Sequence, residues 1–153
     1  MYECSVLPNG LRVVTANMPH THSISISIYL AAGSRHEQSN IIGISHFVEH
    51  MLFKGTENLP NAMAISAAIE GIGGIINAEA GKEATVYWTK VPRLHFVTAL
   101  ETLTDIVLHS VLSPSEIEKE RQVILEELDM VMDVPQEWVD LLIDQVLWGD
   151  QPL

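Results

Sequence analysis

The first third of the chain alternates apolar and polar residues in a way that is typical of β-strands. Between His22 and Leu30, isoleucines occupy every second position and serines lie between them. Successive side chains of a strand point to opposite faces, so this segment is expected to be a half-buried strand. Upstream, Asn9 and Gly10 before a run of apolar and β-branched residues predict a hairpin. Near its early strand, the single cysteine, Cys4, is expected to be buried.

Helical spacing of apolar residues dominates the rest of the chain. Two further strands are expected at 75–79 and 84–91, on either side of a polar turn. Helices are expected at 42–53, 61–70, 93–112, 113–132 and 135–147, with Asn61 and Ser113 as N-caps. The glycines at 71–74 are expected to end a helix, because the Lys-Ser/Thr pair of a phosphate loop is absent. No repeat or linker divides the 153 residues, so residues 1–153 are predicted to form one α+β domain.

The charge of the chain excludes some partners. With a net charge of −12, binding to nucleic acid or to an anionic membrane surface is not expected. From Ser113 onward there are eleven acidic residues against two basic ones. They form either a solvated helical face or a negative wall that attracts basic peptides. No apolar run could span a bilayer, no signal peptide is recognisable, and one cysteine suits a reducing compartment, so a cytoplasmic location is expected.

The segment from Gly43 to Gly55 carries the chemistry. His46 and His50 are four residues apart, so on a helix both imidazoles project from the same face. Two neutral imidazoles at this spacing can bind one zinc ion, and Glu49 lies beside them. Zinc-bound water is acidic, and a neighbouring carboxylate can accept its proton. The order His-x-x-Glu-His is the inverted zinc-protease motif; the alternative is an amphipathic helix that carries two histidines by chance.

A third ligand is sought on the helix expected at 113–132. One stripe, linked by three- and four-residue steps, is apolar apart from two carboxylates: Ile117, Glu120, Ile124, Glu127, Leu128 and Val131. Glu126 lies outside this stripe, on the side of the helix that is expected to face solvent. Buried acids need a positive partner, and basic residues are few, so zinc held by the two histidines would fit. Glu127 is therefore the candidate ligand, and Glu120 the candidate acceptor for a histidine N–H. Ordinary salt bridges are the alternative.

These motifs resemble those of the pitrilysin family of zinc peptidases, which includes the mitochondrial processing peptidase and the insulin-degrading enzyme. The resemblance is carried by residues 43–56 and 120–127, and it extends over nearly the whole chain. In the family pattern 76 residues separate the second histidine from a glutamate, which is the separation of His50 and Glu127. The resemblance implies an antiparallel sheet flanked by helices, with His46, His50 and Glu127 as zinc ligands, Glu49 as base and Glu120 as an assisting acid.

The same resemblance implies a substrate strand, a substrate class and partners. Asn77 and Ala78 match the family's peptide-binding strand, whereas Glu79 and Ala80 depart from its Tyr/Phe-Thr. The expected function is a zinc endopeptidase, with one Zn²⁺ per chain, acting on peptides or unfolded precursor segments. Family members are several times longer, so the chain is expected to be a fragment that needs a homologous second half, a partner subunit or a second copy of itself. Two alternatives are a non-catalytic subunit that binds peptides or scaffolds a complex, and a structural zinc site.

Overall fold

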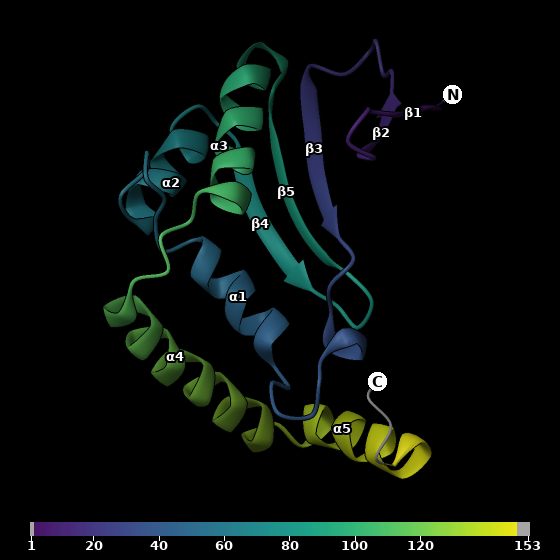
Figure 1. The fold of residues 1–153 in the computed structure, drawn as a ribbon, viewed down its shortest axis with the longest axis vertical. Coiled ribbons are helices and arrows are strands. Elements are labelled where there is room, and N and C mark those ends of the chain that lie inside the picture. Colours follow the sequence, from purple (N-terminus) through teal and green to yellow (C-terminus); the bar gives the residue numbers. More distant parts are fainter. Residues whose placement is uncertain (1, 150–153) are drawn as a thin grey trace.

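The computed structural model describes residues 2–149, which form a small antiparallel sheet covered by helices (Figure 1). The strands are β1 (Tyr2–Val6), β2 (Arg12–Ala16), β3 (Ser23–Leu30), β4 (Ile75–Ala80) and β5 (Thr85–Pro92). The helices are α1 (Ile44–Leu52), α2 (Ala62–Glu70), α3 (Phe96–Leu108), α4 (Pro114–Asp133) and α5 (Pro135–Trp148), with 3-10 turns at Ser34–His36 and Arg93–His95. The predicted α+β class, with an antiparallel sheet flanked by helices, is confirmed.

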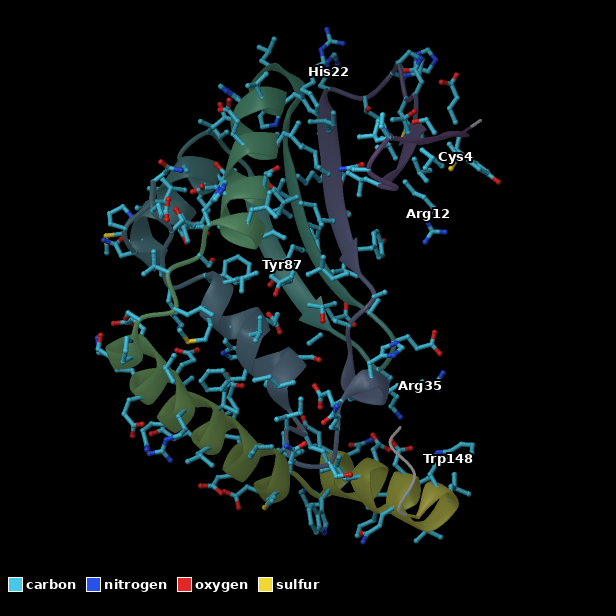
Figure 2. The ribbon with its side chains drawn as sticks, viewed as in Figure 1. Cys4, Arg12, His22, Arg35, Tyr87 and Trp148 are labelled. Atoms are coloured by element: carbon cyan, nitrogen blue, oxygen red, sulfur yellow. The ribbon has the colours of Figure 1, made fainter. Side chains whose placement is uncertain are left out.

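The main sheet has the strand order β3-β5-β4, with both pairs antiparallel. Its alternation gives one face to the core, where Tyr87 and Val91 of β5 are each 1% exposed. Tyr87 packs with Leu52 of α1, Ile65 of α2 and Leu103 of α3, so three helices share the same face of the sheet (Figures 1 and 2). This packing brings the histidine-bearing helix α1 next to β4, one of the two edge strands of this sheet.

The N-terminal hairpin stands apart from this sheet. Strands β1 and β2 pair with each other, and Gly10 adopts φ 88° at the predicted turn. Almost every residue of the two strands is exposed, because nothing among the described elements covers them (Figure 2). Cys4 is therefore exposed, and the expectation that it is buried is wrong.

Helix α3 ends at Leu108, four residues before the predicted end. Beyond it Ser110 pairs with Thr56, and the Ser110 hydroxyl donates to the carbonyl oxygen of Leu52 at 3.0 Å. These contacts replace the next helical turn and tie the end of α3 to the end of α1. Both predicted caps are present: Asn61 accepts from the amide of Ala64, and Ser113 from that of Glu116.

Within residues 2–149, none of the helices combines the length and the apolar composition that a membrane span requires. Helix α4 is long enough but strongly charged.

Candidate metal centre

Helix α1 begins at Ile44 because its N-terminus is capped by a residue from the preceding loop. The Glu37 carboxylate accepts hydrogen bonds from the amides of Gly43 at 2.6 Å and Ser45 at 2.7 Å. Gly43 adopts φ 89°, a left-handed conformation that breaks the helix predicted from Ile42. Burial raises the pKa of Glu37, but hydrogen bonds from Ser45 and Gly43 outweigh it, so the net pKa is lowered. An anion at this helix end is stabilising.

His46 and His50 project from one face of α1, as their spacing predicts. Their Nε2 atoms are 3.0 Å apart, and their rings are nearly perpendicular at 87°. The Nδ1 atom of His50 lies 2.7 Å from a Glu120 oxygen. Since an ionised carboxylate only accepts, Nδ1 is the donor in this contact, and in the neutral ring Nε2 is then the nitrogen with the lone pair. Two converging imidazole nitrogens, one with its tautomer fixed in this way, fit a bound metal ion.

Two carboxylates approach the histidine pair from different elements. An oxygen of Glu127, on α4, lies 3.6 Å from His50 Nε2 and 3.8 Å from His46 Nε2. Ligand atoms at tetrahedral zinc are about 3.3 Å apart, given bonds of about 2.0–2.1 Å. The carboxylate of Glu49, on α1, forms a cluster with both histidines in which the ligand atoms lie within 4.8 Å of one another. The site therefore offers two histidines and two acids to one ion.

Glu120 is the buried acid of the site. It is 3% exposed, and its second oxygen lies 2.5 Å from the ammonium nitrogen of Lys54. Burial raises the pKa of Glu120, but the hydrogen bonds and charges of Lys54 and His50 lower it more, so the net pKa is lowered. The expected shortage of basic residues near these acids is therefore wrong for Glu120. Lys54 follows the last turn of α1 and lies within the family-like segment 43–56, but no role was expected for it.

The predicted buried stripe of α4 is only partly buried. Glu120 is buried, Glu127 is half-buried, and Ile117 and Leu128 at the margins are exposed. The helical phase is right, because the residues that face α1 are those predicted. The extent of burial is overestimated, since α1 is the only helix besides α5 that packs extensively against this helix within the described chain.

A cavity of about 220 Å³ lies beside the histidines, between α1, α2, β4 and α4. Its lining combines acids with apolar residues: Glu49, His50, Phe53, Lys54, Ser66, Glu70, Ile76, Asn77 and Glu120. Asn77 is thus at the site, whereas Ala78 is not among the lining residues. The Ala78 amide donates to the Asn77 side chain at 2.9 Å, which indicates that this amide faces the open edge of β4.

The phenol of Tyr87 lies in the core near this site. Burial and the charge of Glu49 raise its pKa, so the phenol stays protonated.

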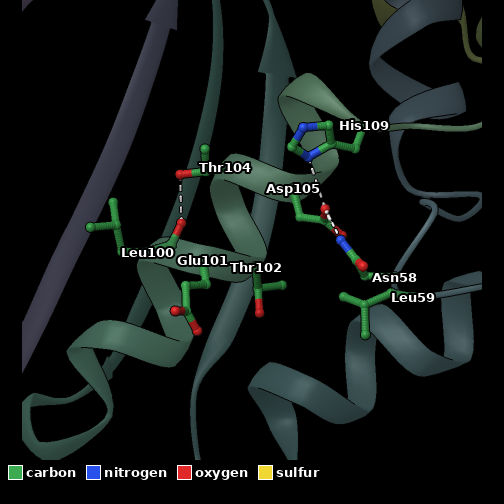
Figure 3. A pocket seen from close by; sticks show the side chains of 8 residues that line it. All are labelled: Asn58, Leu59, Leu100, Glu101, Thr102, Thr104, Asp105 and His109. Atoms are coloured by element: carbon green, nitrogen blue, oxygen red, sulfur yellow. Dashed lines mark hydrogen bonds and ion pairs between the residues drawn. The ribbon is translucent and has the colours of Figure 1, made fainter.

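A larger cavity, of about 600 Å³, lies elsewhere, along α3 (Figure 3). It contains none of the predicted site residues. Buried Asp105 accepts hydrogen bonds there from Thr56, Asn58 and His109. Burial raises the pKa of Asp105, but these three bonds and the charge of His109 lower it net. The cluster fixes the loop that follows α1, the helix that carries His46 and His50.

Comparisons with known proteins identify the family of the chain. A sequence model of the insulinase family, peptidase family M16, matches residues 12–153. The chain belongs to this family. The resemblance to zinc peptidases of the pitrilysin type is therefore confirmed.

Relatives of this M16 chain are named as proteases. A zinc protease of Bacillus subtilis is 40% identical over 152 residues, covering 99% of this chain and 36% of the relative. The β-subunit of the mitochondrial processing peptidase of Saccharomyces cerevisiae is 40% identical over 149 residues, covering 97% and 32%. The crystal structure of a protease from Helicobacter pylori superposes with a TM-score of 0.81 at 31% identity, covering 87% and 32%. The chain thus spans about a third of the length of these relatives.

Proposed function

We propose that this chain is the zinc-binding catalytic part of a metalloendopeptidase that hydrolyses peptides or unfolded precursor segments. The observation that carries the proposal is the approach of His46 Nε2, His50 Nε2 and a Glu127 oxygen to within 3.8 Å of one another, with Glu49 beside them. In this proposal the two histidines and Glu127 hold one zinc ion. When bound, zinc supplies Lewis acidity, which polarises a carbonyl group and makes a neighbouring water molecule more acidic.

The acids of the site take separate roles. Glu49 accepts the proton of the attacking water and then delivers it to the leaving amine, the usual work of a general base that becomes a general acid. Glu120 accepts from His50 Nδ1 at 2.7 Å and keeps that ring turned toward the ion. Three protein ligands leave one coordination position for water or substrate, as catalytic zinc sites require. This favours a catalytic site over a structural one.

The substrate strand is assigned to the open edge of β4. Residues Ile75–Ala80 pair with β5 on one side only, and the Ala78 amide is bonded by the side chain of its own neighbour. A peptide in extended conformation can replace that contact and add a strand. Because main-chain hydrogen bonds do not depend on side-chain identity, we expect this strand to accept a broad range of peptide sequences.

A homologous second half or a partner subunit is assigned as the second wall of the chamber that holds the substrate. Helices α4 and α5 leave apolar side chains exposed, such as Met130 at 66% and Val146 at 84%. Surfaces of this kind mark contacts with other protein. Holding a peptide in attack geometry and excluding water both require such a wall.

The proposal is tested by zinc analysis together with cleavage of a quenched fluorescent peptide. We expect one zinc per chain and slow cleavage that a chelator abolishes and added zinc restores. The Glu49→Gln variant should be inactive with its zinc intact. Stoichiometric zinc without any cleavage, even with a homologous second half added, would support the non-catalytic peptide-binding subunit instead. Absence of zinc would refute the proposed catalytic function.

A further inference from the structure

Helix α4 packs against α1 through a stripe in which Glu120 is the one buried residue. Among the residues of α4, Glu120 is the one that is buried, whereas the apolar stripe residues Ile124 and Val131 are half-buried. Yet α4 carries Glu127, whose carboxylate has to meet the histidines of α1. Its apolar contacts are only partly buried, so the polar contacts of buried Glu120 add to the positional accuracy that a third ligand requires.

Both oxygens of Glu120 are held by the same segment of chain. One lies 2.7 Å from His50 Nδ1 and the other 2.5 Å from Lys54 Nζ. A carboxylate held at both oxygens has a fixed plane, whereas one held at a single oxygen can rotate about its bond to Cγ. Removing either partner also leaves a buried charge uncompensated, which is strongly unfavourable.

The backbone that carries Lys54 is itself well fixed. The Lys54 amide donates to the carbonyl of Met51 at 3.1 Å, and the next residue, Gly55, accepts from the amide of Val111 at 2.9 Å. Thr56 donates to buried Asp105. The ammonium group therefore approaches Glu120 from an ordered base, and its side chain is 26% exposed.

We propose that Lys54 is a positioning residue of the metal centre. It holds Glu120 in one orientation, so that α4 is docked on α1 with Glu127 facing the two histidines, and the His50 ring keeps its lone pair directed at the ion. The proposal rests on the proposed zinc-binding function and adds a residue that acts on the metal centre through Glu120.

The test compares zinc affinity, measured by competition with a chelating dye, for the Lys54→Met and Lys54→Arg variants. We expect Lys54→Met to bind zinc about tenfold more weakly, the lower end of the range for partners of metal ligands. Arginine keeps a cation within reach of Glu120 and should recover most of the affinity. Lys119→Met is the matched control. The ion pair of Lys119 with Glu116, at 2.6 Å, lies on the exposed side of α4, the helix that carries Glu120. This control variant should bind zinc like the parent.

A second measurement reads the geometry without zinc or turnover. In the metal-free protein, the His50 ring signals in ¹⁵N NMR should show a single Nδ1–H tautomer, and Lys54→Met should convert it to a mixture. If the parent binds no zinc, the proposed function fails whatever Lys54 does. If the parent binds zinc and a folded Lys54→Met variant binds it equally well, the role of Lys54 is refuted. Should Lys54→Met not fold, Lys54→Gln replaces it, and equal zinc affinity of the Gln and Arg variants would overturn the proposal.

Discussion

The Asp105 cluster offers a quantitative test of how the loop behind the metal centre is held. Asp105 is 9% exposed and accepts from the Thr56 hydroxyl, the Asn58 amide at 2.7 Å and His109 Nδ1 at 3.0 Å (Figure 3). The perturbation is Asp105→Asn, which keeps the shape but turns one acceptor into a donor. Because the Thr56 oxygen already accepts from the amides of Asn58 and Leu59, it has little capacity to accept another bond.

The magnitude follows from the bonds that are lost. A hydrogen bond to a charged group contributes about 1.5–3 kcal/mol. The variant keeps one acceptor oxygen and loses the charge, so we expect its free energy of unfolding to fall by about 2–3 kcal/mol. For a chain of this size that corresponds to a decrease in Tm of about 4–12 °C. Glu101→Gln, on the exposed side of the same helix, should change Tm little.

The assay is urea unfolding of both proteins at neutral pH and again in acid. The folded-state pKa of Asp105 lies below its ordinary value of 3.8. Its carboxylate therefore contributes fully above that value, and the contribution disappears as the pH falls through the folded-state pKa. The parent and Asp105→Asn should thus differ most at neutral pH and converge in strong acid. An unchanged free energy of unfolding at pH 7, or a difference that grows in acid, would refute this reasoning.

Three further predictions concern the edges of the site. Ala78→Pro should raise KM about fivefold, the loss of one hydrogen bond, without loss of zinc; an unchanged KM would move the docking strand elsewhere. Glu37→Gln should lower the free energy of unfolding by about 1 kcal/mol and speed amide exchange at Gly43 and Ser45; unchanged exchange would exclude Glu37 as a cap. In sedimentation the isolated chain should self-associate, and Val146→Asp should weaken this association; a monomeric parent would contradict the exposed-surface argument.

The sequence predicts most of the fold because local signals and periodicity agree. The alternation before Leu30 and the caps at Asn61 and Ser113 are local signals, and the strands and helices follow them. The end of α3 was not predictable in this way. It is decided by Ser110, whose contacts with Thr56 and Leu52 join segments more than fifty residues apart.

The sequence predicts the proximity of the candidate zinc ligands, because their residue types and their positions on the helices both indicate it. The spacing of His46 and His50 and the phase of Glu127 bring all three together, as expected. The contacts of Lys54 and Glu37 were not predicted. Lys54 lies within the matching segment 43–56 and Glu37 in a loop, and their partners, Glu120 and the amide of Gly43, are known only from the tertiary structure. Cys4 was misjudged for a related reason: strand pattern alone does not say which sheet a strand joins.

Zinc content of paired carboxylate variants tests the central assignment most directly. Glu127 and Glu49 both lie near the histidines. In the proposed mechanism Glu127 is a zinc ligand and Glu49 is the general base. Metal analysis of purified protein should show that Glu127→Gln loses most of its zinc, whereas Glu49→Gln and the control Glu126→Gln keep it. If Glu49→Gln is the variant that comes out metal-free while Glu127→Gln retains zinc, the roles are reversed and the proposed mechanism is wrong.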